Sequence, residues 1–291
     1  LSVSMSIVFF FPHLWESPIH NFITIFNNLN KHPWIGNNLF FGNLIPASNV
    51  PWYYIITWIF ISTPLTFLFF LIVGSIRLIF DIFISHGKDN LFKAFMLFGF
   101  ITPLMATIIL NSTLYNGWRH LFFVYPFIAY LMTYGFEFVF RWLSMKLKSN
   151  LMYALIFCTF IHPIYFIYIS HPNQQVFFNR IAGKNALENF EGDYWANSVG
   201  QLLKWIAKND ETDVINVASP FNVAAKNNVI LDQKDRVRFH YFALKNENSI
   251  SQNYENFFSI QDDKNNSANY VITNSRLERE GYSPGSEDKL F

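Results

Sequence analysis

The residues best suited to chemistry lie in one short stretch, TLYNGWRHLFFVYPF, at positions 113–127. Within six residues it brings together Tyr115, Trp118, Arg119 and His120, just before a long apolar run. Trp and Tyr are common where a membrane helix meets water, but Arg119 and His120 add positive charge and hydrogen-bond donors. A guanidinium matches the oxygens of a phosphate, so the stretch fits an anionic lipid headgroup. The alternative is that Arg119 only extends from a helix end towards water.

One acid and several aromatic residues are further candidates. Glu16 is the only acid in the two outward loops assigned below, which makes it a candidate for a catalytic carboxylate. It could equally cap a surface helix or pair with Lys31 or Arg119. The aromatic candidates for lining a ligand groove are Tyr115, Trp118, Trp34, Trp52 and Tyr53. For each of these the alternative role is anchoring at the membrane interface.

The sequence contains no pattern that indicates a metal or a cofactor. It has no Cys-rich or His-rich spacing typical of metal sites and no Gly-rich phosphate loop. The single cysteine, Cys158, lies within an apolar run, and we expect it to be a small buried hydrophobic residue.

The composition changes from that of a membrane protein to that of a water-soluble one. Of the 291 residues, 52% are hydrophobic and 14% are charged, whereas soluble domains carry about 25% charge. Residues 1–169 contain 8 Lys/Arg and 4 acids, and residues 170–291 contain 13 Lys/Arg and 16 acids. We therefore predict a transmembrane domain over 1–169 and a soluble domain over 170–291. The net charge of +1 gives no basis for binding nucleic acid.

Several apolar runs approach or exceed the roughly 20 residues that a membrane-spanning helix needs. The predicted spans are residues 52–80, 94–110, 120–143 and 151–169, and Pro64 is expected to kink the first of them. The shorter run 3–11 predicts the end of a helix whose beginning is missing. Because the chain begins with Leu, we expect it to be the C-terminal part of a longer protein.

A polar loop, residues 12–51, connects the partial helix to the first complete span. Within it, the apolar stripe over 19–29 predicts an amphipathic helix lying flat on the membrane, or packed under the rest of the loop. Lys and Arg are concentrated in cytoplasmic loops, and six of them share one side: Arg77, Lys88, Lys93, Arg141, Lys146 and Lys148. Loops 12–51 and 111–119, with only Lys31 and Arg119, and the soluble domain are therefore predicted to face outward.

The soluble part predicts a small α/β domain. Trp195–Ala207 has an apolar face of helical period, and the short β-branched or aromatic runs 213–219, 236–242 and 269–274 predict strands. Helices are plausible near 220–227 and 247–258, and strands that alternate with helices are typical of an α/β unit. Residues 275–291 are predicted to be a loose end.

Five motifs in order are PHLWESP at 12–18, HPWIGNNLFFG at 32–42, LIPASNVPWYYIITWIFISTPL at 44–65, LYNGWRHLFFVYP at 114–126, and FNRIAG with FEGDYW between 178 and 195. With them the chain resembles the C-terminal half of bacterial family-39-like glycosyltransferases. These are membrane enzymes of the C-type fold, related to protein O-mannosyltransferases and lipid A aminoarabinose transferases. The motifs cover most of residues 9–207.

The resemblance implies a reaction and a location. Such enzymes sit in the plasma (inner) membrane and move a sugar from a polyprenyl-phosphate donor to a protein, lipid or glycan acceptor on the outer face, without a cofactor. A carboxylate in the family's first outward loop acts as general base. That loop is not in this chain, so the chain alone is expected to be inactive. Arg119, and with it His120, would then bind the lipid phosphate.

Two alternatives remain at this level. A transporter that binds a lipid-linked sugar without chemistry would usually show polar or charged residues in mid-membrane and inverted repeats. The spans of this sequence are almost free of charge, and no repeat is visible. The second alternative is a non-catalytic remnant that binds a lipid-linked sugar, because the loop that carries the family's general base is not in this chain.

Overall fold

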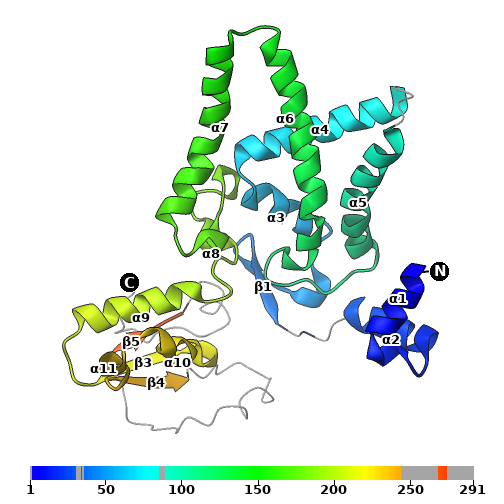
Figure 1. The fold of residues 1–291 in the computed structure, drawn as a ribbon. Helices are drawn as coiled ribbons and strands as arrows, with labels where there is room; N and C mark the ends of the chain where they lie inside the picture. Colours follow the sequence, from blue (N-terminus) through cyan, green and yellow to red (C-terminus); the bar gives the residue numbers. More distant parts are fainter. Residues whose placement is uncertain (1, 31–33, 35, 85–88, 244–267, 274–291) are drawn as a thin grey trace. The chain divides into compact units, whose positions relative to one another are not determined.

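The computed structural model describes residues 2–30, 34, 36–84, 89–243 and 268–273 (Figure 1). The chain forms two compact units. The first comprises Leu1–Asn38, Ile45–Thr159 and Asn179–Ile181, and the second comprises Leu39–Leu44, Phe160–Phe178 and Ala182–Phe291. The division falls inside the helix α7 (Ser149–Ile169), ten residues before the composition change near Ser170.

Within the described residues, four helices are long and apolar enough to cross a membrane. They are α4 (Leu65–Ile84), α5 (Asn90–Ile109), the helical segment Arg119–Ser144 and α7 (Ser149–Ile169). Three of them match the predicted spans 94–110, 120–143 and 151–169, with ends shifted by a few residues, and α4 matches only the later part of the predicted span 52–80. The third segment is a 3-10 turn, η3 (Arg119–Val124), that continues into α6 (Tyr125–Ser144). Few side chains of α5 and α7 are buried in the protein alone, as expected where lipid would cover them.

The first predicted span is broken rather than kinked at Pro64. A separate helix, α3 (Tyr54–Ser62), ends before the proline, and α4 begins after it at Leu65. Thr63 is extended (φ −103°, ψ 132°), which is the conformation that a following proline favours. Because Pro64 has no N–H, it also cannot continue the helical hydrogen bonds of α3. The predicted span 52–80 is therefore wrong at its start.

The helices α4 and α6 pack against each other, and α4 runs across α6 in Figure 1. They approach most closely at two glycines. A Cβ atom added to Gly74 would lie 1.9 Å from the backbone oxygen of Leu131, and one added to Gly135 would lie 2.1 Å from the backbone oxygen of Phe70. The two backbones are therefore in direct contact, as is common between membrane helices with small residues at the crossing.

Side chains of the long helices differ in their surroundings. Glu137 and Arg141, one turn apart on α6, form an ion pair, with 2.5 Å between the carboxylate Oε1 and the guanidinium Nη2. The burial of Cys158 is wrong, because its side chain is exposed. It lies on α7, whose apolar side chains mostly point away from the protein, so an apolar sequence around a residue does not imply burial inside the protein.

The first part of the chain consists of α1 (Ser2–Phe10), the 3-10 turn η1 (Pro12–Leu14) and α2 (Pro18–Asn30). The predicted amphipathic helix over 19–29 is confirmed as α2. Its large apolar side chains follow the helical period on one face and are exposed: Ile19, Phe22, Ile23 and Phe26. An exposed apolar stripe of this kind is suited to the interfacial region of a bilayer.

We expect this face of α2 to lie in the membrane interface. In nanodiscs, the double substitution Phe22→Asp and Phe26→Asp should speed amide hydrogen exchange in α2 by about tenfold, because charge opposes burial of the face. The matched control is Asn27→Asp with Asn28→Asp, which adds the same charge to exposed polar positions of the same helix. Equal exchange in the two double variants would contradict membrane contact by this face.

The rest of the predicted loop 12–51 contains a two-stranded sheet that the sequence did not indicate. The strands are β1 (Asn37–Phe40) and β2 (Asn43–Pro46), followed by the 3-10 turn η2 (Ala47–Asn49). The turn residues Phe41 and Gly42 have positive φ values of 48° and 73°, as tight hairpin turns require. A phenylalanine is unusual there, which explains why this turn has no clear sequence signal.

The second unit contains a three-stranded parallel sheet. The strand order is β4 (Phe239–Ala243), β3 (Ile215–Ser219), β5 (Tyr270–Val271). Ile215 pairs with Phe239, and Val217 pairs with Tyr270. The three predicted strands are therefore confirmed. The predicted helix near 247–258 and the loose end 275–291 lie outside the described residues.

Helices connect and cover this sheet. They are α8 (Ala186–Asn189), α9 (Asn197–Asn209), α10 (Val223–Asn227) and α11 (Gln233–Arg236), with 3-10 turns at 174–176, 180–182, 220–222 and 228–230. The core is formed by Val199, Leu203, Ile206, Ile215, Val217, Ala224, Leu231, Phe239 and Ile272. The apolar face predicted for Trp195–Ala207 is thus buried, except that Trp195 precedes α9 and is exposed.

Polar contacts fix the end of α9 to the sheet. The Arg238 guanidinium donates to the carbonyl oxygens of Ala207 (3.2 Å), Asp210 and Thr212 (2.9 Å). The Asp210 carboxylate accepts from the hydroxyl and the N–H of Thr212 and from the Tyr270 hydroxyl (2.9 Å). These hydrogen bonds, those of Thr212 above all, lower the pKa of the Asp210 carboxyl.

Candidate phosphate-binding site

The loop that follows α5 is held in place by a buried asparagine from β1. The Asn38 side chain, which is 0% exposed, donates through Nδ2 to the Leu114 carbonyl oxygen (2.8 Å). Its Oδ1 accepts from the Asn116 N–H (3.1 Å). A single amide therefore fixes the backbone on both sides of Tyr115. Because the two bonds use a donor and an acceptor at set positions, they define the conformation of the loop at this residue.

The same loop is also attached to α3. The Gly117 N–H donates to the Tyr54 hydroxyl (3.2 Å), and the Trp118 indole N–H donates to the Ser62 hydroxyl (3.0 Å). The backbone reverses at Asn116 and Gly117, which both have positive φ. Trp118 is 4% exposed. It is therefore an internal anchor of the loop in this structure, away from any surface where a ligand would bind.

Beyond this anchor, the predicted residues form an aromatic–cation cluster, which we define as Trp34, Tyr115, Arg119 and His120. The Tyr115 and Trp34 rings are stacked, with centroids 4.2 Å apart and planes at 17°. The guanidinium carbon of Arg119 lies 4.7 Å from the centre of the Tyr115 ring. The His120 ring meets Tyr115 edge-on at 4.6 Å. Tyr115 is thus the centre of the cluster.

The cluster holds a cation at the start of a candidate membrane span. Arg119 is the first residue of η3 and of the apolar segment Arg119–Ser144. A cation over an aromatic face is stabilised without losing its charge. Arg119 is partly exposed and His120 is exposed, so both can reach an anion. Arg119 would supply a permanent charge with planar donors, and His120 a further ring N–H donor.

The charge around the cluster is positive because acids are absent from the surrounding sequence. Residues 17–80 and 90–136 contain no Asp or Glu. In the first unit, the described carboxylate of Asp81 lies 2.8 Å from Arg77, and that of Glu137 pairs with Arg141. Neither acid belongs to the loop or to the segments that hold it. An incoming phosphate would meet no negative charge from these segments.

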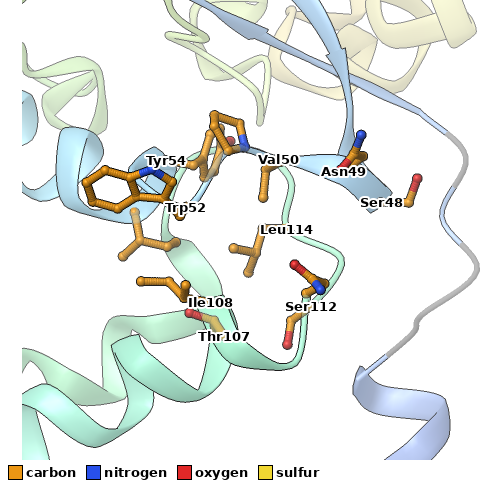
Figure 2. Close-up of a pocket in the computed structure, with 12 residues that line it drawn as sticks. Ser48, Asn49, Val50, Trp52, Tyr54, Thr107, Ile108, Ser112 and Leu114 are labelled. Carbon is orange, nitrogen blue, oxygen red and sulfur yellow. The ribbon is translucent and has the colours of Figure 1, made fainter.

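Trp52 and Tyr53 form an exposed aromatic pair beside a small pocket. Their rings meet edge-on at 5.5 Å. Trp52 lines a small pocket whose walls come from two segments, 48–55 and 107–114 (Figure 2). Leu114 belongs to this pocket and directly precedes Tyr115 in the chain. Trp52 therefore lies at a pocket of its own, and the loop that carries Tyr115 contributes to both this pocket and the aromatic–cation cluster.

Glu16 is not brought to the aromatic–cation cluster by any described contact. It is exposed between η1 and α2. Among the residues that the structure describes, no hydrogen bond or ion pair of its carboxylate occurs, whether with Arg119 or another residue. Lys31, its other expected partner, lies outside the described residues.

Sequence reasoning missed a second buried asparagine at the break between α3 and α4. The Asn179 Nδ2 donates to the carbonyl oxygens of Phe60 (2.5 Å) and Thr63 (2.6 Å), and its backbone N–H donates to that of Ile61 (2.8 Å). Because Pro64 has no N–H, the Phe60 carbonyl lacks its helical partner, and Asn179 supplies one. Pro64 signals the unsatisfied carbonyl in the sequence, but the donor is distant in the chain and carries no signal.

The chain was compared with protein-family models, with curated proteins and with solved structures. None of them matches. The role of the aromatic–cation cluster is therefore argued from its own residues and their geometry.

Proposed function

We propose that this chain is part of a membrane glycosyltransferase that moves a sugar from a polyprenyl-phosphate donor to an acceptor at the outer face of the membrane. In this proposal the aromatic–cation cluster binds the phosphate of the donor. The observation that carries it is Arg119 over the Tyr115 ring at 4.7 Å, at the first residue of an apolar segment that is long enough to span a bilayer.

The position of the cluster supports a lipid phosphate over a soluble anion. A polyprenyl chain lies among the lipid tails, so its phosphate is held at the level where membrane helices end. Trp34 and Tyr115 are of the type that occupies this level, and their stacked rings present an apolar surface beside the cation. A lipid with an apolar chain and a phosphate head would use both parts.

The cluster also provides what the reaction needs at the leaving group. When the bond between sugar and phosphate breaks, negative charge increases on the phosphate oxygens. Fixed cations and donors that face those oxygens stabilise the transition state. Arg119 would take this role, with His120 as a second donor. The proposal assigns the general base to a carboxylate of another outward segment, as the resemblance implies, and leaves Glu16 as a candidate for positioning the acceptor.

The proposal is tested by removing the cation. Arg119→Ala should weaken binding of polyprenyl phosphate to the full-length protein in nanodiscs by about 10- to 100-fold, because a hydrogen bond to a charged group contributes about 1.5–3 kcal/mol. Arg119→Lys should give an intermediate loss, since it keeps the charge but not the planar donors. Binding can be measured by native mass spectrometry of the protein with the lipid.

The matched control is Arg141→Ala, an exposed arginine near the other end of the helical segment Arg119–Ser144, whose partner is Glu137. It removes the same charge from the same segment and should leave binding unchanged. Tight binding by Arg119→Ala, or an equal loss in the two variants, would remove Arg119 from the site. Donor binding without sugar transfer by the full-length protein would instead indicate a non-catalytic lipid-linked-sugar binding or transport protein.

A further inference from the structure

The pocket beside Trp52 differs from the aromatic–cation cluster in having no charge. Its twelve lining residues include no Asp, Glu, Lys, Arg or His. Its polar members include Asn49, Asn111 and Ser112, while Ile55, Ile108 and Leu114 are apolar. A pocket of this composition does not select an ion. It favours a neutral ligand that carries both polar groups and an apolar face.

Asparagine and tryptophan in this arrangement match a sugar ring. Each asparagine amide offers a donor and an acceptor, which suits hydroxyl groups that both donate and accept. Trp52 is 65% exposed, so its ring is available as a flat apolar surface for the C–H face of a sugar. The pocket itself is small, with a cavity volume of about 40 Å³. It can take the hydroxyl edge of a ring, while the rest of the ring lies on Trp52.

The pocket is joined to the aromatic–cation cluster by one rigid loop. Leu114 lines the pocket, and the next residue, Tyr115, is the centre of the cluster. Asn38 fixes the backbone at Leu114 and Asn116, and the Leu114 N–H donates to the Ala47 carbonyl (3.0 Å). The pocket and the aromatic–cation cluster are therefore held in fixed positions relative to each other, a few residues apart in the chain. A sugar linked to a phosphate likewise has a neutral part next to an anionic part.

We infer that the pocket formed by Trp52, Asn49, Asn111 and Ser112 is a binding site for the sugar ring of the lipid-linked substrate, next to the phosphate bound by the aromatic–cation cluster. The inference rests on the proposed function and adds a sugar subsite to it. The same chemistry could serve a sugar of the donor or a sugar of a glycan acceptor, and the experiment separates these two sources.

The competing explanation is that Trp52 is only an interfacial anchor, and the chain offers a matched comparison. Trp142, near the end of α6, is 52% exposed and lines none of this pocket. Trp52→Ala and Trp142→Ala remove the same ring from two exposed positions. For the amide, Asn111→Gly is the suitable variant, because Asn111 has a φ of 46° and glycine adopts this conformation without strain.

The experiment measures binding to the full-length protein in nanodiscs with three probes: polyprenyl phosphate, the same lipid carrying a hexose or a pentose, and a free oligosaccharide panel. We expect the wild type to bind at least one glycosylated lipid about tenfold more tightly than the sugar-free lipid. Trp52→Ala and Asn111→Gly should each reduce this ratio several-fold and leave binding of the sugar-free lipid unchanged. Trp142→Ala should leave the ratio unchanged.

The possible outcomes test the sugar subsite separately from the phosphate site. If the sugar-free lipid binds through Arg119 but no sugar increases the affinity, the sugar subsite is wrong and the phosphate site stands. An equal effect of Trp52→Ala and Trp142→Ala would also overturn the subsite. If no lipid phosphate binds at all, the proposed function fails. If the two pocket variants lose oligosaccharide binding and the lipid ratio is intact, the subsite takes the acceptor's sugar.

Discussion

Replacing Gly74 by alanine is expected to destabilise the first unit by about 3 kcal/mol, near the upper end of what overpacking usually costs. The new Cβ atom would lie 1.9 Å from the Leu131 carbonyl oxygen and 2.8 Å from the Gly135 nitrogen. Both are backbone atoms of α6, which cannot move aside as a side chain can. The helices α4 and α6 must therefore separate, although alanine alone favours a helix over glycine.

Gly99→Ala is the control for this prediction. Gly99 lies in α5, and the three atoms nearest to its added Cβ belong to the ring of Phe127, at 2.3–2.6 Å. A ring can shift or rotate, so the same chemical change should cost clearly less there. The two variants can be compared by reversible unfolding in mixed micelles with increasing denaturing detergent. A loss of stability for Gly74→Ala no greater than for Gly99→Ala would show that α4 and α6 are not in backbone contact.

The close contact of α4 and α6 illustrates which part of the fold the sequence could predict. Spans are local properties of composition, so hydropathy located all four long helices, three of them within a few residues and α4 with its start 13 residues too early. Gly74 and Gly135 are each a single glycine in an apolar run, and such a glycine has no distinctive pattern. That they face one another depends on how two helices meet, which no local pattern encodes. The break at Pro64 is intermediate, because the proline was visible but its full effect depended on Asn179.

The residues of the candidate site could also be predicted only in part from the sequence. Tyr115, Arg119 and His120 were found together because they are close in the chain. Trp34 was chosen only as an interfacial aromatic, and its stacking on Tyr115 comes from tertiary structure. Trp118 has the same residue type and the same neighbourhood, yet it is buried because the Ser62 hydroxyl lies within hydrogen-bond distance of its indole. Residue type alone could not separate an exposed ring from an anchor.

Asn38→Leu is expected to disrupt the site more than any change of an exposed residue. Leucine has a similar volume but neither donor nor acceptor, so the Leu114 carbonyl and the Asn116 N–H would both lose their partner. Leaving buried polar groups unsatisfied costs about 1–3 kcal/mol each. Tyr115 lies between these two residues, so we expect the loop 111–120 to loosen and binding of polyprenyl phosphate to fall by at least about tenfold, which corresponds to about 1.4 kcal/mol.

The neighbouring Asn37→Leu is the matched control, because Asn37 is the first residue of β1 and is only partly buried. Hydrogen exchange of the loop 111–120, binding of the lipid and the unfolding midpoint should be measured together. A positioning role predicts faster exchange in this loop and weaker binding in Asn38→Leu, under conditions where the unit is still folded, and neither effect in Asn37→Leu. If binding instead falls only when the whole unit unfolds, Asn38 stabilises the fold without positioning Tyr115, and the geometry of the aromatic–cation cluster does not depend on its amide.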